Sequence, residues 1–261
     1  MQVWTVANQK GGVAKTTTAV GLAGIAAEAG LRVLMLDMDP HGSLTSYFKW
    51  NPDQLESSTY NLFELRKNLS RESVLGLIKA SGFERIDLIP AAVTLATLER
   101  QAIGEGMGLV VTRALALLER DYDLVLLDCP PQLGVLLVNA IAACGTLVVP
   151  VQTEFLAIQG LERILNTLNM LGKSLRKHID YTIVPVMFDR RTQASVVSLR
   201  TLRNSYAERV WPGRIPVDTR LRDASKAGVP PSLFDASSHG VLAYRALYKF
   251  LLNENRNLKV G

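Results

Sequence analysis

The sequence predicts a single α/β domain over residues 1–261, with a mostly parallel sheet sandwiched between helices. Short apolar runs typical of buried strands alternate with helix-like stretches along the chain. Hydrophobic residues make up 48% of the chain and charged residues 20%, which is typical of a globular protein and not of a disordered one. The first strand and helix are joined by a glycine-rich loop, which indicates a P-loop nucleotide-binding domain.

This loop follows Val3–Ala7, a short and partly β-branched stretch that predicts a buried strand, and precedes a predicted helix over Thr16–Ala29. Glycines let backbone N–H groups approach phosphate oxygens, and a helix N-terminus adds unpaired donors. Lys15 can then reach the β- and γ-phosphates, and the Thr16 hydroxyl can ligate Mg²⁺. The expected phosphate contacts are Lys10, Gly11, Gly12, Val13, Ala14, Lys15, Thr16 and Thr17.

The loop departs from the usual pattern G-x-x-x-x-G-K-[ST], because Gln9 and Ala14 stand where glycines are expected. It also holds a second lysine, Lys10, five residues before Lys15. The stretch Lys-Gly-Gly-x-x-Lys-Thr-Thr resembles the deviant Walker A loop of the ParA/MinD ATPases. That resemblance implies that Lys10 reaches across a dimer to the partner's nucleotide. The methyl group of Ala14 costs little if φ is negative and is strained if φ is positive. The plainer alternative is a glycine-rich turn that only caps a helix.

A second predicted strand, Val33–Leu36, leads into Asp37-Met38-Asp39-Pro40-His41-Gly42. Asp37 and Asp39 point the same way on an extended chain, at the strand end where doubly wound sheets bind ligands. The stretch resembles the Walker A′ segment of the same family. The resemblance implies that Asp39 orients or activates the attacking water and that Asp37 helps to place Mg²⁺. His41 stands where the family usually has Gln. A helix N-cap turn without a catalytic role is the alternative.

The middle of the chain carries weaker signals. Leu44–Trp50 is expected to be the end of a helix, followed by a turn at Asn51–Asp53. Short amphipathic helices are expected at Leu62–Leu65 and Arg71–Ile78. At least two of the aromatic side chains of residues 47, 48 and 50 are expected in the core. A strand over Ile86–Pro90, a helix starting at Thr94–Arg100 and a long helix over Glu105–Leu118 follow.

An apolar run that closes on an aspartate, Leu124–Asp128 followed by Cys-Pro-Pro, has the Walker B form. Its carboxylate emerges at the sheet edge, where it can contact Mg²⁺ through water. We interpret Cys129 as a buried inert thiol and not a nucleophile, because no histidine is near it in sequence. Residues 133–151 carry no charge and imitate a membrane span, but Asn139, Gly145 and Pro150 interrupt them. They are better interpreted as a helix over 133–143 and a strand over 146–149.

The C-terminal half continues the alternation. Helices are predicted over Phe155–Leu171, Thr192–Glu208, Leu221–Lys226 and Ser238–Leu252, and strands over Tyr181–Phe188 and Ile215–Val217. The family resemblance implies that Asp189, Pro216 and Val217 flank the adenine. The final residues, 251–261, lack the apolar stripe of a membrane-anchoring helix, and no membrane helix is expected.

The charge is uneven. The whole chain carries a net +5, whereas residues 181–261 hold 13 Lys/Arg against 6 Asp/Glu. A basic C-terminal third on a near-neutral body suggests a polyanion partner. We expect non-specific DNA binding through Arg200, Arg203, Arg220 and Arg222, of which the first two share a helix face. The alternative is a solvated basic face, or pairing of these arginines with Asp218 and Asp223.

The resemblance covers about residues 2–252 and implies an ATPase that binds ATP and Mg²⁺ and forms a homodimer with ATP. Hydrolysis is expected to be slow and stimulated by a partner protein. The expected work is to position cargo, either a DNA locus or a polar, chemotaxis or flagellar cluster. Two cysteines fit a reducing cytosol, so the expected location is cytoplasmic, nucleoid-associated or polar.

Two other classes of function remain open. The first is a nucleotide-gated adaptor with negligible hydrolysis. The second is a protein that hands on metal clusters or electrons, similar to a nitrogenase reductase. That use needs paired interface cysteines, which Cys129 and Cys144 do not provide.

Overall fold

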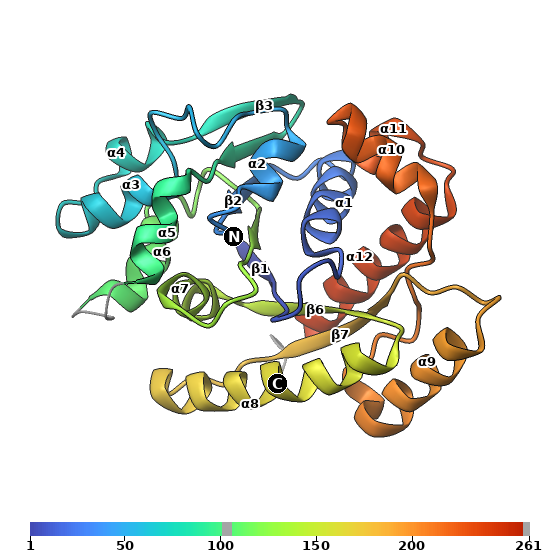
Figure 1. Ribbon diagram of the computed structural model, residues 1–261. Coiled ribbons are helices and arrows are strands. Elements are labelled where there is room, and N and C mark those ends of the chain that lie inside the picture. Colours follow the sequence, from blue (N-terminus) through green and yellow to red (C-terminus); the bar gives the residue numbers. More distant parts are fainter. Residues whose placement is uncertain (101–105, 258–261) are drawn as a thin grey trace.

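The computed structural model describes residues 1–100 and 106–257. Seven strands in these ranges form one sheet in the order β3-β4-β2-β5-β1-β6-β7 (Figure 1). All neighbouring strands are parallel except β3 and β4. The strands are β1 (Gln2–Val6), β2 (Val33–Asp37), β3 (Lys79–Phe83), β4 (Ile86–Ile89), β5 (Leu124–Asp128), β6 (Thr146–Gln152) and β7 (Tyr181–Val186). The predicted α/β class with a mostly parallel sheet is therefore confirmed.

Helices connect the strands and cover both faces of the sheet. The α-helices are α1 (Lys15–Glu28), α2 (Ser43–Tyr47), α3 (Thr59–Glu64), α4 (Arg71–Leu75), α5 (Ala96–Glu99), α6 (Val110–Ala116), α7 (Val135–Ala143), α8 (Phe155–Leu175), α9 (Gln193–Tyr206), α10 (Thr219–Ala227), α11 (Pro231–Phe234) and α12 (His239–Asn257). Short 3₁₀ turns lie at Leu65–Lys67, Val93–Leu95, Met107–Leu109 and Ala207–Arg209. In Figure 1, α7 and α8 lie on one side of the sheet, and α1 and α12 lie on the other.

Alternation along the central strands divides the core in two. On β5, Val125 and Leu127 pack in one cluster with α6, α7 and α8, whereas Leu124 and Leu126 pack in the other with α1 and α12. Side chains of successive strand residues point to opposite faces, so a strand buried on both faces must be apolar throughout. This explains why the runs before Asp37 and Asp128 contain no polar residue. The carboxylates of Asp37 and Asp128 therefore lie at the same edge of the sheet.

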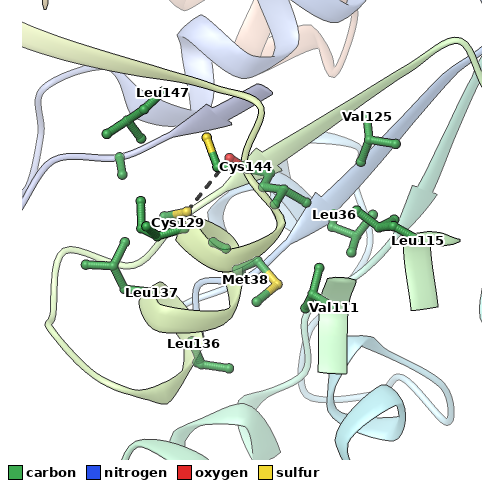
Figure 2. Close-up of a cluster of buried hydrophobic side chains, with 14 of the residues drawn as sticks. Leu36, Met38, Val111, Leu115, Val125, Cys129, Leu136, Leu137, Cys144 and Leu147 are labelled. Atoms are coloured by element: carbon green, nitrogen blue, oxygen red, sulfur yellow. Dashed lines mark hydrogen bonds between the residues drawn. The ribbon is translucent and has the colours of Figure 1, made fainter. Parts of the chain in front are cut away.

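Both cysteines lie in the first of these clusters. Figure 2 shows Cys129 and Cys144 among apolar side chains that include Leu136, Leu137 and Leu147. Burial raises the pKa of the Cys129 thiol well above its usual range and that of Cys144 to about 11. A thiol held in its neutral form is a poor nucleophile. The predicted burial of Cys129 is confirmed, and its inertness stays a prediction.

Two element predictions were wrong in whole or in part, and one strand was not predicted. Ile215–Val217 makes only an isolated bridge between Pro216 and Phe188, in which the Phe188 N–H donates to the Ile215 carbonyl and the Val217 N–H donates to the Phe188 carbonyl. Strand β3 was not predicted, since Lys79–Phe83 is an edge strand with half-exposed side chains and no apolar run. The predicted helix over Glu105–Leu118 is a 3₁₀ turn followed by α6, and Glu105 itself lies outside the described residues.

Candidate nucleotide and magnesium site

The loop between β1 and α1 has the shape of a phosphate cradle. Gly12 has φ of 73° and Ala14 has φ of 58°, and α1 begins immediately afterwards at Lys15. Cβ atoms placed on Gly11 or Gly12 would meet no other atom within 4 Å, so the backbone faces open space. N–H groups at a helix N-terminus beside such a space are suited to an anion. The backbone of Ala14 is therefore strained, because a residue with a Cβ rarely adopts a positive φ.

Three loop and strand residues converge where the cation of a nucleotide would bind. The Thr16 hydroxyl donates to Asp128 Oδ2 over 2.6 Å, which places the end of β5 against the start of α1. Asp128 Oδ1 is buried and has no hydrogen-bond partner among the described residues. The Lys15 ammonium donates to the carbonyl of Lys10 over 3.3 Å, so it lies folded over the loop. An unpartnered buried carboxylate oxygen next to a hydroxyl is a set of hard oxygen donors of the kind that Mg²⁺ prefers.

Asp37 is the neighbour of Asp128 across the β2–β5 pair, where the two residues are in register. Its oxygens accept from the Thr45 N–H over 2.8 Å, the Thr45 hydroxyl over 2.7 Å and the Asp39 N–H over 3.1 Å. Burial is the main cause that raises the pKa of Asp37 to about 7 and that of Asp128 to about 8. Two buried carboxyls with too little positive charge nearby fit a divalent cation, which would favour their charged forms.

Asp39 follows β2 and is held in a tight turn. Asp39 Oδ1 accepts from the backbone N–H of His41 over 3.0 Å and lies 3.0 Å from His41 Nδ1. The side chain of Asp39 is 12% exposed, whereas that of His41 is 75% exposed. Asp39 and His41 line a cavity of about 300 Å³ together with Glu99, Arg100 and Gln132. Asp39 is thus a nearly buried carboxylate with access to a small open space.

Lys10 is partly exposed and pairs with Glu154, at the N-cap of α8. Large apolar side chains are exposed close to this ion pair in sequence: Phe155 is 69% exposed and Leu156 is 66% exposed. Leu156 and Lys10 also line a cavity of about 550 Å³. A charged side chain beside exposed apolar groups is typical of a surface that another molecule covers.

The residues expected around adenine lie together. Asp189, Pro216 and Val217 line one cavity of about 720 Å³, with Trp211 and Phe188 among its other walls. Hydrogen bonds from the Arg191 guanidinium, 2.7 Å at the closest, lower the pKa of Asp189 to about 2. The cavity has the aromatic and polar walls that suit a planar base. That adenine occupies it stays a prediction.

The basic residues proposed for DNA come from separate parts of the structure. Arg200 and Arg203 are exposed on α9, which packs against α8, whereas α10 packs against α11 and α12. Arg203 donates to the Pro212 carbonyl. On α10, Arg220 pairs with Asp235 over 2.9 Å and with Asp223 over 3.7 Å. Arg222, also on α10, is exposed.

Sequence reasoning missed two residues that hold the site in place. Thr45 satisfies Asp37 with two hydrogen bonds, and Glu154 pairs with Lys10 across 144 positions of sequence. No local pattern marks a threonine in a short helix or an acidic residue after a strand as a partner of a distant loop. Among the described residues, no helix is long and apolar enough to cross a membrane.

Comparison with known proteins places these observations in a family. A family model described as an AAA domain matches residues 1–181. The sporulation initiation inhibitor protein Soj of Bacillus subtilis is 34% identical over 250 residues, which are 95% of this chain and 97% of Soj. The chromosome partitioning protein ParA of Myxococcus xanthus is 30% identical over 252 residues, 96% of this chain and 87% of the relative.

Solved structures agree on the fold. A Mycobacterium smegmatis protein described as a cobyrinic acid a,c-diamide synthase, with bound ATP analogue and magnesium, has a TM-score of 0.83 at 32% identity. The match covers 97% of this chain and 94% of that one. An aspartate-to-alanine variant of Cyanothece McdA in complex with ATP has the same fold, with a TM-score of 0.83 at 21% identity over 97% of this chain and 96% of that one.

Proposed function

The chain belongs to the ParA/MinD family of P-loop ATPases, and from that premise we propose that it is an ATP-dependent dimerising switch. ATP and Mg²⁺ are its cofactors, and hydrolysis of ATP to ADP and phosphate returns the dimer to monomers. The switch positions cargo in a bacterial cell, and a partner protein stimulates its slow hydrolysis. ParA of Myxococcus xanthus, to which the chain is similar over nearly its full length, is a chromosome partitioning protein, and this favours a DNA locus as the cargo.

The observation that carries this proposal is the pair of lysines on one loop, which have different surroundings. Lys15 is almost buried and lies over the phosphate cradle, as a residue that binds nucleotide in its own subunit should. Lys10 is partly exposed and lies beside the uncovered apolar side chains of α8. A loop lysine that only bound its own nucleotide would not need this outward position. Lys10 is suited to a nucleotide held by a second copy of the chain.

The residues of the site divide the chemistry among them. Lys15 and the N–H groups of the loop bind and orient the phosphates. Thr16 and Asp128, with Asp37 behind them, hold Mg²⁺, which neutralises charge on the β- and γ-phosphates when bound. Asp39 orients the attacking water and accepts its proton. Lys10 of each subunit stabilises the charge that develops on the partner's γ-phosphate.

The basic C-terminal third supports a second part of the proposal. Exposed arginines on α9 and α10 grip DNA phosphates without reading bases, so the dimer rides on the nucleoid. Dimerisation doubles the number of basic helices, and the avidity that results makes DNA binding depend on ATP. This gives the switch a cytoplasmic, nucleoid-associated location.

Release of phosphate at saturating Mg²⁺-ATP, with and without DNA, tests the switch against a nucleotide-gated adaptor with negligible hydrolysis. We expect slow release by the wild-type protein, none by Lys15→Gln and almost none by Asp39→Ala. The Asp39→Ala protein should still bind ATP, because Asp39 lies outside the phosphate cradle. Absence of release by the wild-type protein under all these conditions would favour the adaptor. Equal rates for wild type and Asp39→Ala would remove Asp39 from the chemistry.

A further inference from the structure

A pair of buried hydroxyls joins the ends of β6 and β7. Thr153, which directly follows β6, is 3% exposed, and Ser195, in the first turn of α9, is 4% exposed. Their hydroxyl oxygens lie 2.6 Å apart. β6 is a parallel neighbour of both β7 and β1, so these strand ends lie at the sheet edge that also carries the phosphate-binding loop. The hydroxyl pair is therefore a buried link between two loops of the candidate site.

Each hydroxyl has a further partner in the loop after β7. Ser195 Oγ accepts from the Asp189 N–H over 3.1 Å. Thr153 Oγ1 lies 3.4 Å from the Met187 carbonyl oxygen, and the Thr153 N–H donates to the Val186 carbonyl over 3.1 Å. A hydroxyl donates once and can accept twice. Both protons are used when Ser195 donates to Thr153 and Thr153 donates to the Met187 carbonyl.

The loop that these bonds hold is strained and forms a wall of a cavity. Met187 has φ of 53°, which a residue with a Cβ rarely adopts. Strained backbone persists where the surrounding structure holds it, and it is concentrated at functional sites. Phe188 and Asp189, next in the chain, line the cavity of about 720 Å³ in which we expect adenine. A base in this cavity would contact the segment that the hydroxyl pair holds.

The ion pair of Lys10 lies at the other end of this connection. Thr153 is followed directly by Glu154, which is the N-cap of α8 and pairs with Lys10. The Glu154 N–H donates to the Gln152 carbonyl over 2.8 Å, so Thr153 lies inside a tight turn. Hydrogen-bond networks of this kind can carry energetic coupling between sites. Lys10 must leave Glu154 to reach a nucleotide in a second copy, so a shift of this turn bears on its release.

We propose that Thr153 and Ser195 are positioning residues that couple occupation of the base cavity to the release of Lys10 for dimerisation. This coupling rests on the role of Lys10 in the proposed function. It makes dimerisation respond to the base of the nucleotide and not only to its phosphates. By linkage, dimerisation tightens the binding of a nucleotide with a base by the same factor.

Ribose 5′-triphosphate is the probe, because it carries the phosphates and the sugar of ATP and lacks only the base. Each ligand is added with Mg²⁺ at saturation, and its binding is measured by displacement of a fluorescent ATP analogue. All proteins carry Asp39→Ala, which should keep hydrolysis slow. We expect the dimer dissociation constant, measured by sedimentation, to be at least about fivefold lower with ATP than with ribose 5′-triphosphate.

Four substitutions test the hydroxyl pair. Thr153→Val and Ser195→Ala each remove one hydroxyl without a change of charge. In both, the ratio of the two dissociation constants should fall to about one, while ribose 5′-triphosphate binds as before. Thr153→Ser keeps the hydroxyl and should keep the ratio. Thr182→Val, at a buried position of β7, is the matched control and should also keep it.

A ratio that survives in both Thr153→Val and Ser195→Ala would overturn the role of the hydroxyl pair. Loss of the ratio in Thr182→Val as well would also count against it, because removal of any buried hydroxyl would then have the same effect. Equal dimerisation with the two ligands, when Thr153 and Ser195 are intact, would overturn the coupling and leave the proposed switch standing. Absence of dimers with ATP would overturn the proposed switch, and the coupling with it.

Discussion

Ala14 is the residue of the phosphate-binding loop whose backbone is most clearly strained, and its replacement by glycine should stabilise the protein. Ala14 has φ of 58° and ψ of 31°, a left-handed conformation, at the position just before α1. A residue with a Cβ pays roughly 1–2 kcal/mol for this conformation, and glycine does not. The family resemblance places a glycine more often at this position.

The expected gain is smaller than this strain, because glycine also makes the unfolded chain more flexible. That second effect destabilises by about 0.4–1 kcal/mol. The free energy of unfolding of Ala14→Gly should therefore rise by about 0.5–1 kcal/mol. Ala29, at the other end of α1, has φ of −77° and is exposed. Ala29→Gly should lower the free energy of unfolding, because it brings the flexibility without relief of strain.

Urea unfolding of the nucleotide-free protein, followed by circular dichroism, measures both variants against wild type. The prediction is a higher midpoint for Ala14→Gly and a lower one for Ala29→Gly, with the same slope in both. If the two substitutions lower the midpoint equally, Ala14 is not strained in the free protein.

Three further predictions concern the cation, the pH and DNA. Asp128→Ala should weaken nucleotide binding about 10- to 100-fold in Mg²⁺ and much less in EDTA, as measured by calorimetry; equal losses in both would remove Asp128 from the metal site. Because the pKa values of Asp37 and Asp128 are raised from 3.8 to about 7 and about 8, the folded metal-free protein keeps protons that the unfolded chain has released. These two carboxyls should therefore contribute stability that is fully present below the ordinary carboxyl pKa and is lost as the pH rises toward 8. In urea titrations, the free energy of unfolding should fall less between about pH 5 and 8 in Asp37→Asn than in wild type, and an unchanged decline in that variant would contradict the assignment. Mobility shifts on random duplex DNA should require ATP and should fall steeply as the salt concentration rises. They should also weaken when Arg200 and Arg203, or Arg220 and Arg222, are both replaced by Glu, and a shift that neither double substitution changes would contradict DNA binding by these arginines.

The central strands and the aspartates that end them could be predicted from the sequence, because both depend on a local pattern of residues. A strand buried on both faces must be apolar along its whole length, so Leu124–Leu127 could be assigned, and the aspartate that ends the run had to emerge at the edge. The half-exposed edge strand β3 does not need to be apolar, so its sequence contains no apolar run that would predict a strand. Ile215–Val217 has β-branched residues that favoured a strand, but its pairing stops at one bridge.

Long-range partners could not be predicted in the same way. Glu154 pairs with Lys10 only because the sheet order places the end of β6 beside the first loop. The buried oxygen of Asp128, the left-handed conformation of Ala14 and the contact of His41 with Asp39 are likewise properties of geometry. Each depends on backbone angles or atomic distances that residue types alone do not determine.

The central claim is that Lys10 acts across a dimer, and the mass of the protein in solution tests it most directly. Light scattering after size exclusion, with Mg²⁺ and a slowly hydrolysed ATP analogue, compares wild type with Lys10→Gln and with Glu154→Gln as the matched control. Binding of the analogue is measured for each protein. We predict dimers for wild type and Glu154→Gln, and a monomer that still binds the analogue for Lys10→Gln. A Lys10→Gln protein that dimerises as wild type does would contradict the account.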